Sequence, residues 1–299
     1  ASEGAEEHPV NLTGNVKITS DGLGITARGN VNIKNAPDNQ SATQVNVETG
    51  YATGVYVNGG TFKMESGAEI SVESTVQNGY TWGLPPEGQG TSPNIYNGVY
   101  VQGGSLVSEG TLNVTFTGVE NEARNVSGND QIVYNGENTS FLNQQTKSYA
   151  VRVEAGTGTN TNVTIDSGNI TNTVGGGVLV NGGKVTLGTT GEGAYNESTK
   201  RGLTVQTTGT EVNTSLIYIN GMADNWAYYW NMKGGDAVKV DGGDLYVYGG
   251  KYTAAQGNGI LTRGGTANIF NGIFTGGYNS NYHATTGAAS TYSFKAYGG

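Results

Sequence analysis

The chain has 299 residues, a formal net charge of -9, 35% hydrophobic residues, 51 glycines and no cysteine. Proteins that bind nucleic acid or anionic lipid concentrate Lys and Arg on one surface, whereas the 15 basic residues here are dispersed, so we expect neither partner. The lack of Cys excludes disulfides. The sequence also lacks a run of about 20 apolar residues, so we expect no direct membrane insertion.

One phrase returns along the chain: an alternating apolar triplet, a glycine turn and a second alternating run. Residues 55–60 read Val-Tyr-Val-Asn-Gly-Gly and are followed by Thr-Phe-Lys-Met. A third alternating run follows at residues 68–72, after a Glu-Ser-Gly corner. Each unit therefore predicts three short strands joined by glycine corners. Related phrases begin at Gly22, Val99, Val178, Ile217, Val238 and Ile260.

The spacing of the phrase identifies the kind of repeat. The interval from Val238 to Ile260 is about 22 residues, a length typical of one solenoid coil. The interval from Ile217 to Val238 is nearly the same, and the interval from Val55 to Val99 is twice as long. The spacing predicts an all-β, single parallel β-helix, a three-faced β-solenoid with about 22 residues per coil and about ten coils. By the usual rule for parallel crossovers, we expect this β-helix to be right-handed.

Successive side chains of a strand point to opposite sides, so the alternation also assigns faces. A core built in this way needs few apolar residues, which fits the low hydrophobic content. Glycine suits the corners because tight corners require positive φ. We expect Val55, Val57, Phe62, Met64, Ile70 and Val72 to point inward, and Tyr56, Lys63, Glu69 and Ser71 to face water.

The repeat divides the chain into three parts. Residues 1–10 form an acidic N-terminal arm, residues 11–277 the β-helix, and residues 278–299 a C-terminal cap or subunit-pairing strand. Loop insertions interrupt the helix, and binding residues on a rigid scaffold tend to lie in such loops. The insertions are near residues 77–97, 119–147, 191–201 and 222–233.

Two of the insertions are rich in aromatic residues. Exposed Trp and Tyr rings stack on sugars or anchor protein interfaces. The alternative is that the rings fold back over the side of the solenoid, since large exposed apolar patches are uncommon. The candidate ligand or interface residues are Tyr80, Trp82, Trp226, Tyr228, Tyr229 and Trp230.

A second candidate surface is an outward stripe at the centre of the repeated triplet. Coils that stack in register would align these side chains into a ladder. Such a ladder also stabilises strands by cross-strand packing, and we favour that structural role over ligand binding. The stripe consists of Tyr56, Tyr100 and Tyr218, together with Arg152, Leu179, Lys239 and Leu261.

Residues for catalysis are sparse. Two histidines, His8 and His283, cannot supply a His-based triad or a His-rich metal site. Glycoside hydrolysis needs two facing carboxylates, but Asp236 and Asp241 are an odd number of residues apart and are expected on opposite faces. We therefore expect no enzyme activity and no cofactor. Asp241 and Asp244, at a glycine corner, are a weak candidate for calcium.

The phrase at residues 54–67, with its Gly-Gly-Thr-Phe and Ser-Gly corners, resembles the repeats of bacterial right-handed parallel β-helix surface proteins. These include adhesin-like proteins and autotransporter passengers. The resemblance implies a secreted or cell-surface structural or adhesive role, with host or matrix glycans and proteins as partners. The chain begins at Ala1 without a leader, as expected of a mature secreted chain, although a shortened chain would begin likewise. The alternative is a β-helix that binds or degrades polysaccharide.

The two ends of a solenoid expose unpaired backbone groups. Residues 291–297 alternate like a strand and contain the assembly candidates Tyr292, Phe294 and Tyr297. This tail either caps its own solenoid or pairs with a neighbouring subunit by strand addition. The second alternative predicts end-to-end assembly of the chain with itself into a filament.

Overall fold

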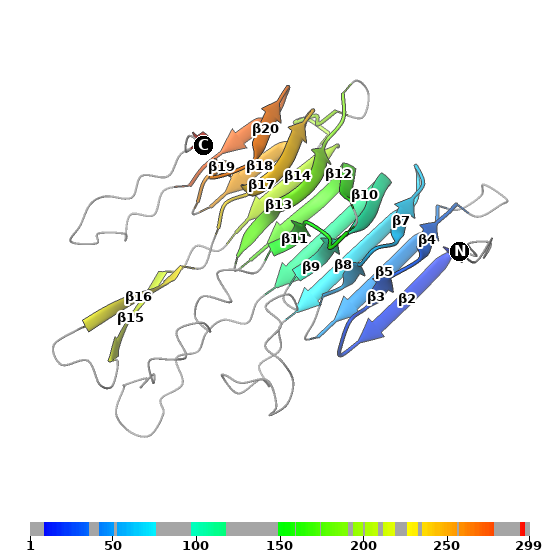
Figure 1. The fold of residues 1–299 in the computed structure, drawn as a ribbon, viewed down its shortest axis with the longest axis horizontal. Coiled ribbons are helices and arrows are strands. Elements are labelled where there is room, and N and C mark those ends of the chain that lie inside the picture. Colours follow the sequence, from blue (N-terminus) through cyan, green and yellow to red (C-terminus); the bar gives the residue numbers. More distant parts are fainter. Residues whose placement is uncertain are drawn as a thin grey trace.

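The chain is all-β in the part that its computed structural model describes, where every regular element is a strand (Figure 1). The described residues are 9–35, 42–50, 53–75, 97–117, 149–158, 160–173, 175–190, 194–199, 201–208, 212–218, 226–232, 235–255, 257–277 and 294–296. Twenty of the strands form one curled sheet in which all the pairings between named strands are parallel. The predicted fold class is confirmed to this extent.

The sheet consists of three stacks of strands, which the chain visits in a fixed order. The first stack contains β1 (Val10–Leu12), β4 (Asn30–Ile33), β7 (Thr61–Met64), the first parts of β10 (Gly104–Thr117) and β12 (Thr161–Asn172), the last parts of β13 (Gly176–Leu187) and β17 (Val238–Val247), and β20 (Thr266–Ile269). The second contains β2 (Asn15–Ser20), β5 (Gln44–Thr49), β8 (Glu69–Thr75), the last parts of β10 and β12, β14 (Leu203–Thr207), β18 (Lys251–Ala254) and β21 (Ile273–Thr275). The third contains β3 (Ile25–Ala27), β6 (Val55–Val57), β9 (Asn97–Gln102), β11 (Tyr149–Glu154), the first parts of β13 and β17, β19 (Ile260–Thr262) and β22 (Phe294–Ala296).

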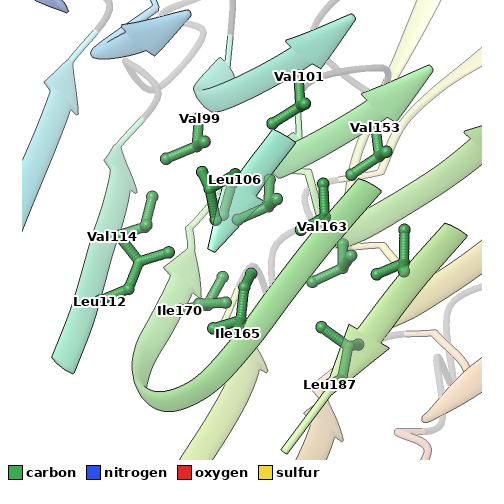
Figure 2. Close-up of a cluster of buried hydrophobic side chains, with 14 of the residues drawn as sticks. Val99, Val101, Leu106, Leu112, Val114, Val153, Val163, Ile165, Ile170 and Leu187 are labelled. Atoms are coloured by element: carbon green, nitrogen blue, oxygen red, sulfur yellow. The ribbon is translucent and has the colours of Figure 1, made fainter. Parts of the chain in front are cut away.

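One strand from each stack, taken in chain order, makes a rung, and the described strands make eight rungs. The core lies inside the curl of the sheet, between the stacks. Figure 2 shows Val99 of β9, Val114 of β10 and Ile165 of β12 pointing into this common interior, and all three are buried. The six side chains expected to point inward are all buried, and the four expected to face water are partly exposed. The predicted alternation is therefore confirmed.

The glycine corners are explained by how closely successive rungs approach. Gly104 has φ of 81°, and a Cβ atom there would lie 2.1 Å from the carbonyl oxygen of Gly60 in the preceding rung. Gly243 likewise has φ of 77°, and its Cβ would lie 2.5 Å from the carbonyl oxygen of Gly183. Both the backbone conformation and the space thus require glycine at this corner.

The interval from Val55 to Val99 does not hold the two coils that its length predicts, because it contains an insertion. Val55 pairs directly with Val99, so the stretch of chain between them makes one rung and not two. Val238 and Ile260 are also direct partners, at the predicted spacing. The shortest rungs thus have the expected length, and longer ones carry extra chain at a corner.

The phrase at Ile217 is not a rung. It lies in β15 (Val212–Tyr218), which pairs antiparallel with β16 (Trp226–Met232) in a separate two-stranded sheet. Val238, which was expected to stack on Ile217, pairs with Val178 instead. Alternation of apolar residues is common to all strands, so the triplet alone could not distinguish this hairpin from a rung.

At both ends of the chain, the strands that join the sheet differ from the predicted division into arm, β-helix and tail. Val10, placed in the acidic arm, already pairs with Val31, and residues 1–8 lie outside the described part. Phe294 pairs with Ile260 of the same chain, so the tail strand is the last member of the third stack. Tyr292 and Tyr297 lie outside the described residues.

Candidate functional site

Long connections leave the sheet at one corner, between the second stack and the third. In the seventh rung the chain crosses this corner quickly, from Tyr252 of β18 to Ile260 of β19. In four other rungs, equivalent core positions are much farther apart along the chain. These longer crossings run from Val72 to Val99, from Val114 to Val151, from Val205 to Val238 and from Phe274 to Phe294. We call this corner the insertion edge.

Three of the expected insertions begin at the insertion edge, and one does not. β8 ends at Thr75 and β9 begins at Asn97; β10 ends at Thr117 and β11 begins at Tyr149. The insertion expected at 222–233 is part of a longer connection, because β14 ends at Thr207 and β17 begins at Val238. The insertion at 191–201 instead joins the first stack to the second. There Lys251 forms an ion pair with Glu197 at 2.9 Å.

Buried polar side chains line the insertion edge on its inner side. Thr49, Ser74, Asn172 and Thr207 occupy one column at the ends of second-stack strands. The Thr49 hydroxyl donates to the Ser74 hydroxyl at 3.0 Å. The Asn172 amide donates to the carbonyl oxygen of Gly176 at 2.8 Å, and the Thr207 hydroxyl to that of Gly235 at 2.7 Å. The bonds from Asn172 and Thr207 hold the backbone where the chain returns to the third stack, across a short crossing in one rung and a long connection in the next.

The hairpin of β15 and β16 belongs to the connection between Thr207 and Val238. Directly opposed residues of an antiparallel pair share a face, as do residues two apart on a strand. The register therefore places Trp226, Tyr228 and Trp230 on one face, opposite Tyr218, Leu216 and Thr214. The second face carries Tyr229 with Asn213, Ser215, Ile217, Ala227 and Asn231.

The structure thus separates the candidate aromatic residues into groups. Trp226, Tyr228 and Trp230 occupy alternate positions of β16, and Tyr229 stands between the last two. Tyr80 and Trp82 lie outside the described residues, in the connection that leaves the same edge after Thr75. Tyr218, expected in the outward stripe, lies on the aromatic face of the hairpin and not in the parallel sheet.

The rest of the outward stripe forms a ladder on the third stack. Tyr56 pairs with Tyr100, which pairs with Arg152, and the column continues through Leu179, Lys239 and Leu261. The rings of Tyr56 and Tyr100 stack with centroids 5.1 Å apart and planes 3° from parallel. Tyr100 is only 2% exposed, although it points away from the core. This face of the third stack is therefore largely covered.

Hydrogen bonds tie the ladder to the next outward column. The Tyr100 hydroxyl donates to Glu154 at 2.7 Å, and the Arg152 guanidinium pairs with the same carboxylate. Burial raises the pKa of Tyr100, and its hydrogen bond to Glu154 acts in the same direction. Burial also opposes the charge on Glu154, but hydrogen bonds from Arg152 and Tyr100 outweigh it and lower the pKa of that carboxyl. The paired groups make a structural cross-link between rungs.

The acidic cluster does not form a facing pair of carboxylates. Asp236 accepts hydrogen bonds from the backbone amide of Asn258 at 2.8 Å and from its side chain at 2.6 Å. Burial raises the pKa of Asp236, against the effect of these bonds. Asp241 instead pairs with Lys239, with Nζ 2.5 Å from Oδ2. Within the described residues no group of three or more His, Cys, Asp or Glu side chains could hold a metal. Calcium at Asp241 and Asp244 stays a prediction.

Sequence reasoning missed that the insertions share an edge. The signal was present, because each Val-x-Val phrase of the third stack follows an apolar pair of the second stack at a variable interval. That interval is shortest between Ile18 and Ile25 and longest between Val114 and Val151. Counting residues from each apolar pair of the second stack to the next phrase of the third stack would have located the insertion edge. Counting from one phrase to the next does not show at which corner the extra residues lie.

No protein-family model, curated protein or solved structure matches this chain. Among the described residues, no helix has the length and apolar character needed to cross a membrane.

Proposed function

We propose that this chain is a secreted or cell-surface right-handed parallel β-helix protein with a structural or adhesive role. The observation that carries this proposal is that four long connections leave the same corner of the sheet. A rigid stack of rungs would present these connections side by side along one edge. A partner could then contact several of them at once, which raises avidity without requiring a deep pocket.

Several features of the sheet support complete, right-handed coils. The chain visits its three stacks in the same order, all the pairings between named strands of the large sheet are parallel, and glycines make the tight corners. Crossover connections between parallel strands are right-handed in nearly all known cases. Far-ultraviolet circular dichroism together with a low-resolution solution envelope would test for an elongated β-rod.

The outward positions suit an aqueous location outside the cell. Exposed positions on the first and second stacks carry Asn, Thr, Lys and Glu, with ion pairs such as Lys17 to Glu48 at 2.7 Å. No catalysis and no cofactor are assigned to the protein in this proposal. Its partners would be host or matrix glycans and proteins, reached through the insertion edge.

Shortening one connection tests this role without removing the core. Residues 118–148 would be replaced by Gln-Gly, the sequence at the equivalent residues 256–257, so that the buried Tyr149 and Ala150 stay in place. We expect an unchanged melting curve and a loss of binding to immobilised matrix proteins or glycan arrays. The matched control deletes residues 37–40, which join the first stack to the second at another corner. Binding that falls equally in both variants would contradict presentation by the insertion edge.

A second candidate is carbohydrate binding by the aromatic face of the hairpin. The alternate positions of Trp226, Tyr228 and Trp230 along β16 favour it, since exposed aromatic rings stack on sugars. We expect Trp226→Ala and Trp230→Ala each to lower glycan affinity at least tenfold, while Tyr229→Ala on the opposite face leaves it unchanged. Equal losses in all three variants would exclude this face as the sugar platform.

A further inference from the structure

Within the described strands, the two ends of the sheet present edges of matching order. Among the described strands, β1, β2 and β3 of the first rung pair only toward the second rung. At the other end, β20, β21 and β22 pair only back toward the seventh rung. Because all these pairings are parallel and the stacks follow one order, the last rung of one chain has the polarity and arrangement needed to precede the first rung of another.

Apolar side chains are exposed at both ends. Ile269 and Ile273 in the last rung are 36% and 46% exposed, and Val10 in the first rung is 58% exposed. Each end also leaves part of the core column half-buried, with Phe274 at one end and Ile18 at the other. In the middle of the sheet the equivalent core side chains are fully buried, because a rung covers them on each side.

We propose that the last rung of one copy of this chain docks on the first rung of a second copy, so that the three stacks continue across the joint. This joint rests on the proposed β-helix and deepens it by naming a second copy as the partner of each end. Continuing the columns sets the register: β20 pairs with β1, β21 with β2 and β22 with β3 of the next copy. Such a contact joins two different surfaces and does not close, so it produces an open-ended fibre.

The columns brought together by this register are compatible. Asn268 stands over Asn11, and Asn11 already accepts a hydrogen bond from Asn32 of the next rung at 3.2 Å. Phe274 stands over Ile18, which extends the apolar column of the second stack. Phe274 stacks on Tyr252 within its own chain, with ring centroids 4.8 Å apart. The joint therefore repeats kinds of contact that already hold neighbouring rungs together.

Two single substitutions test the joint because each blocks one end. Val10→Lys places a charge on the first rung, and Ile269→Lys places one on the last rung. We expect the unmodified chain to form fibres in a concentration series, as seen by sedimentation and electron microscopy, and each variant alone to remain a single rod. An equimolar mixture of the two variants should yield discrete dimers, because each supplies the end that the other has lost.

Controls separate failure of the joint from failure of the fold. Thr164→Lys adds the same charge at an outward position in the middle of the sheet and should leave fibres intact. An unmodified chain that stays monomeric at all concentrations, or a mixture of the two variants that does not dimerise, overturns the joint. Monomeric rods with a β-sheet spectrum and intact adhesion would overturn the joint alone, whereas loss of the β-sheet spectrum would overturn the β-helix as well.

Discussion

The middle and the ends of the sheet use the same residue pattern with different results. Ile165 and Ile269 occupy one column of the first stack, yet Ile165 is fully buried and Ile269 is 36% exposed. The side chains are identical, so the difference comes from neighbours. A residue in the middle is covered by rungs on both sides, whereas a residue at the end has a rung on one side. Stability in this fold is thus a property of position along the stack as much as of sequence.

The largest expected effect removes a side chain from the middle of this column. Ile165→Ala should lower the free energy of unfolding by about 2–5 kcal/mol, because it leaves a cavity that rungs on both sides cannot fill. Ile269→Ala removes the same atoms at the end and should cost about 1 kcal/mol or less. Urea denaturation of both variants measures the contrast. Equal losses would show that the end column is covered as well as the middle.

A second contrast concerns backbone corners. Gly104→Ala combines a positive φ with a Cβ only 2.1 Å from the Gly60 carbonyl oxygen, so we expect a loss of about 3 kcal/mol. Gly14, in the first rung, has φ of 76° but open space around its Cβ position. Gly14→Ala should therefore cost about 1 kcal/mol, from the backbone conformation alone. Thermal melting of both variants separates crowding between rungs from strain within a turn.

A smaller effect is expected on the outer ladder, and it depends on pH. Tyr100→Phe removes the hydrogen bond to Glu154 and should cost about 1–2 kcal/mol at neutral pH. The folded pKa of Glu154 is lowered, so its stabilisation is present above the ordinary value of 4.5 and is lost as pH falls through the folded value. The gap between the two proteins should narrow in acid. Urea midpoints measured from pH 7 to pH 3 would show it, and a constant gap would contradict the pairing.

The smallest effect is expected for an exposed ion pair. Lys251→Gln breaks the contact with Glu197, whose side chain is 55% exposed, and should change the free energy of unfolding by about 0.5 kcal/mol or less. Repeating the measurement in 1 M salt should remove even this difference. A larger loss would mean that the corner at residues 194–199 supports the second stack more than its exposure suggests.

Much of the fold could be predicted from the sequence because short-range rules govern it. Alternation fixed the buried faces of Val55, Phe62 and Ile70, and the glycine pairs marked corners where successive rungs touch. The order in which distant strands pair was harder to predict from the sequence. Val178 and Val238 are partners although the whole hairpin connection lies between them, and no local property of either strand encodes that separation. The hand and closure of the coil stay predictions.

The candidate site was harder to predict for the same reason. Tyr218 and the stripe residue Tyr100 occupy identical positions in their phrases, but one belongs to an antiparallel hairpin and the other to the parallel ladder. The covering of Tyr100 also depends on chain far away in sequence, which alternation cannot reveal. Pattern gives the direction in which a strand residue points, whereas its surroundings depend on the tertiary fold.

The insertion edge has a mechanical consequence. Backbone hydrogen bonds between strands run along the direction in which rungs stack. A force that pulls the two chain termini apart would therefore break these bonds one rung at a time. Releasing the chain from Val238 to Ile260 would add roughly 75 Å of extended length. Releasing the longer stretch from Val178 to Val238 would add roughly 200 Å. A force-extension record should therefore show steps of unequal length. The order of the long and short steps would show which rungs carry the long connections.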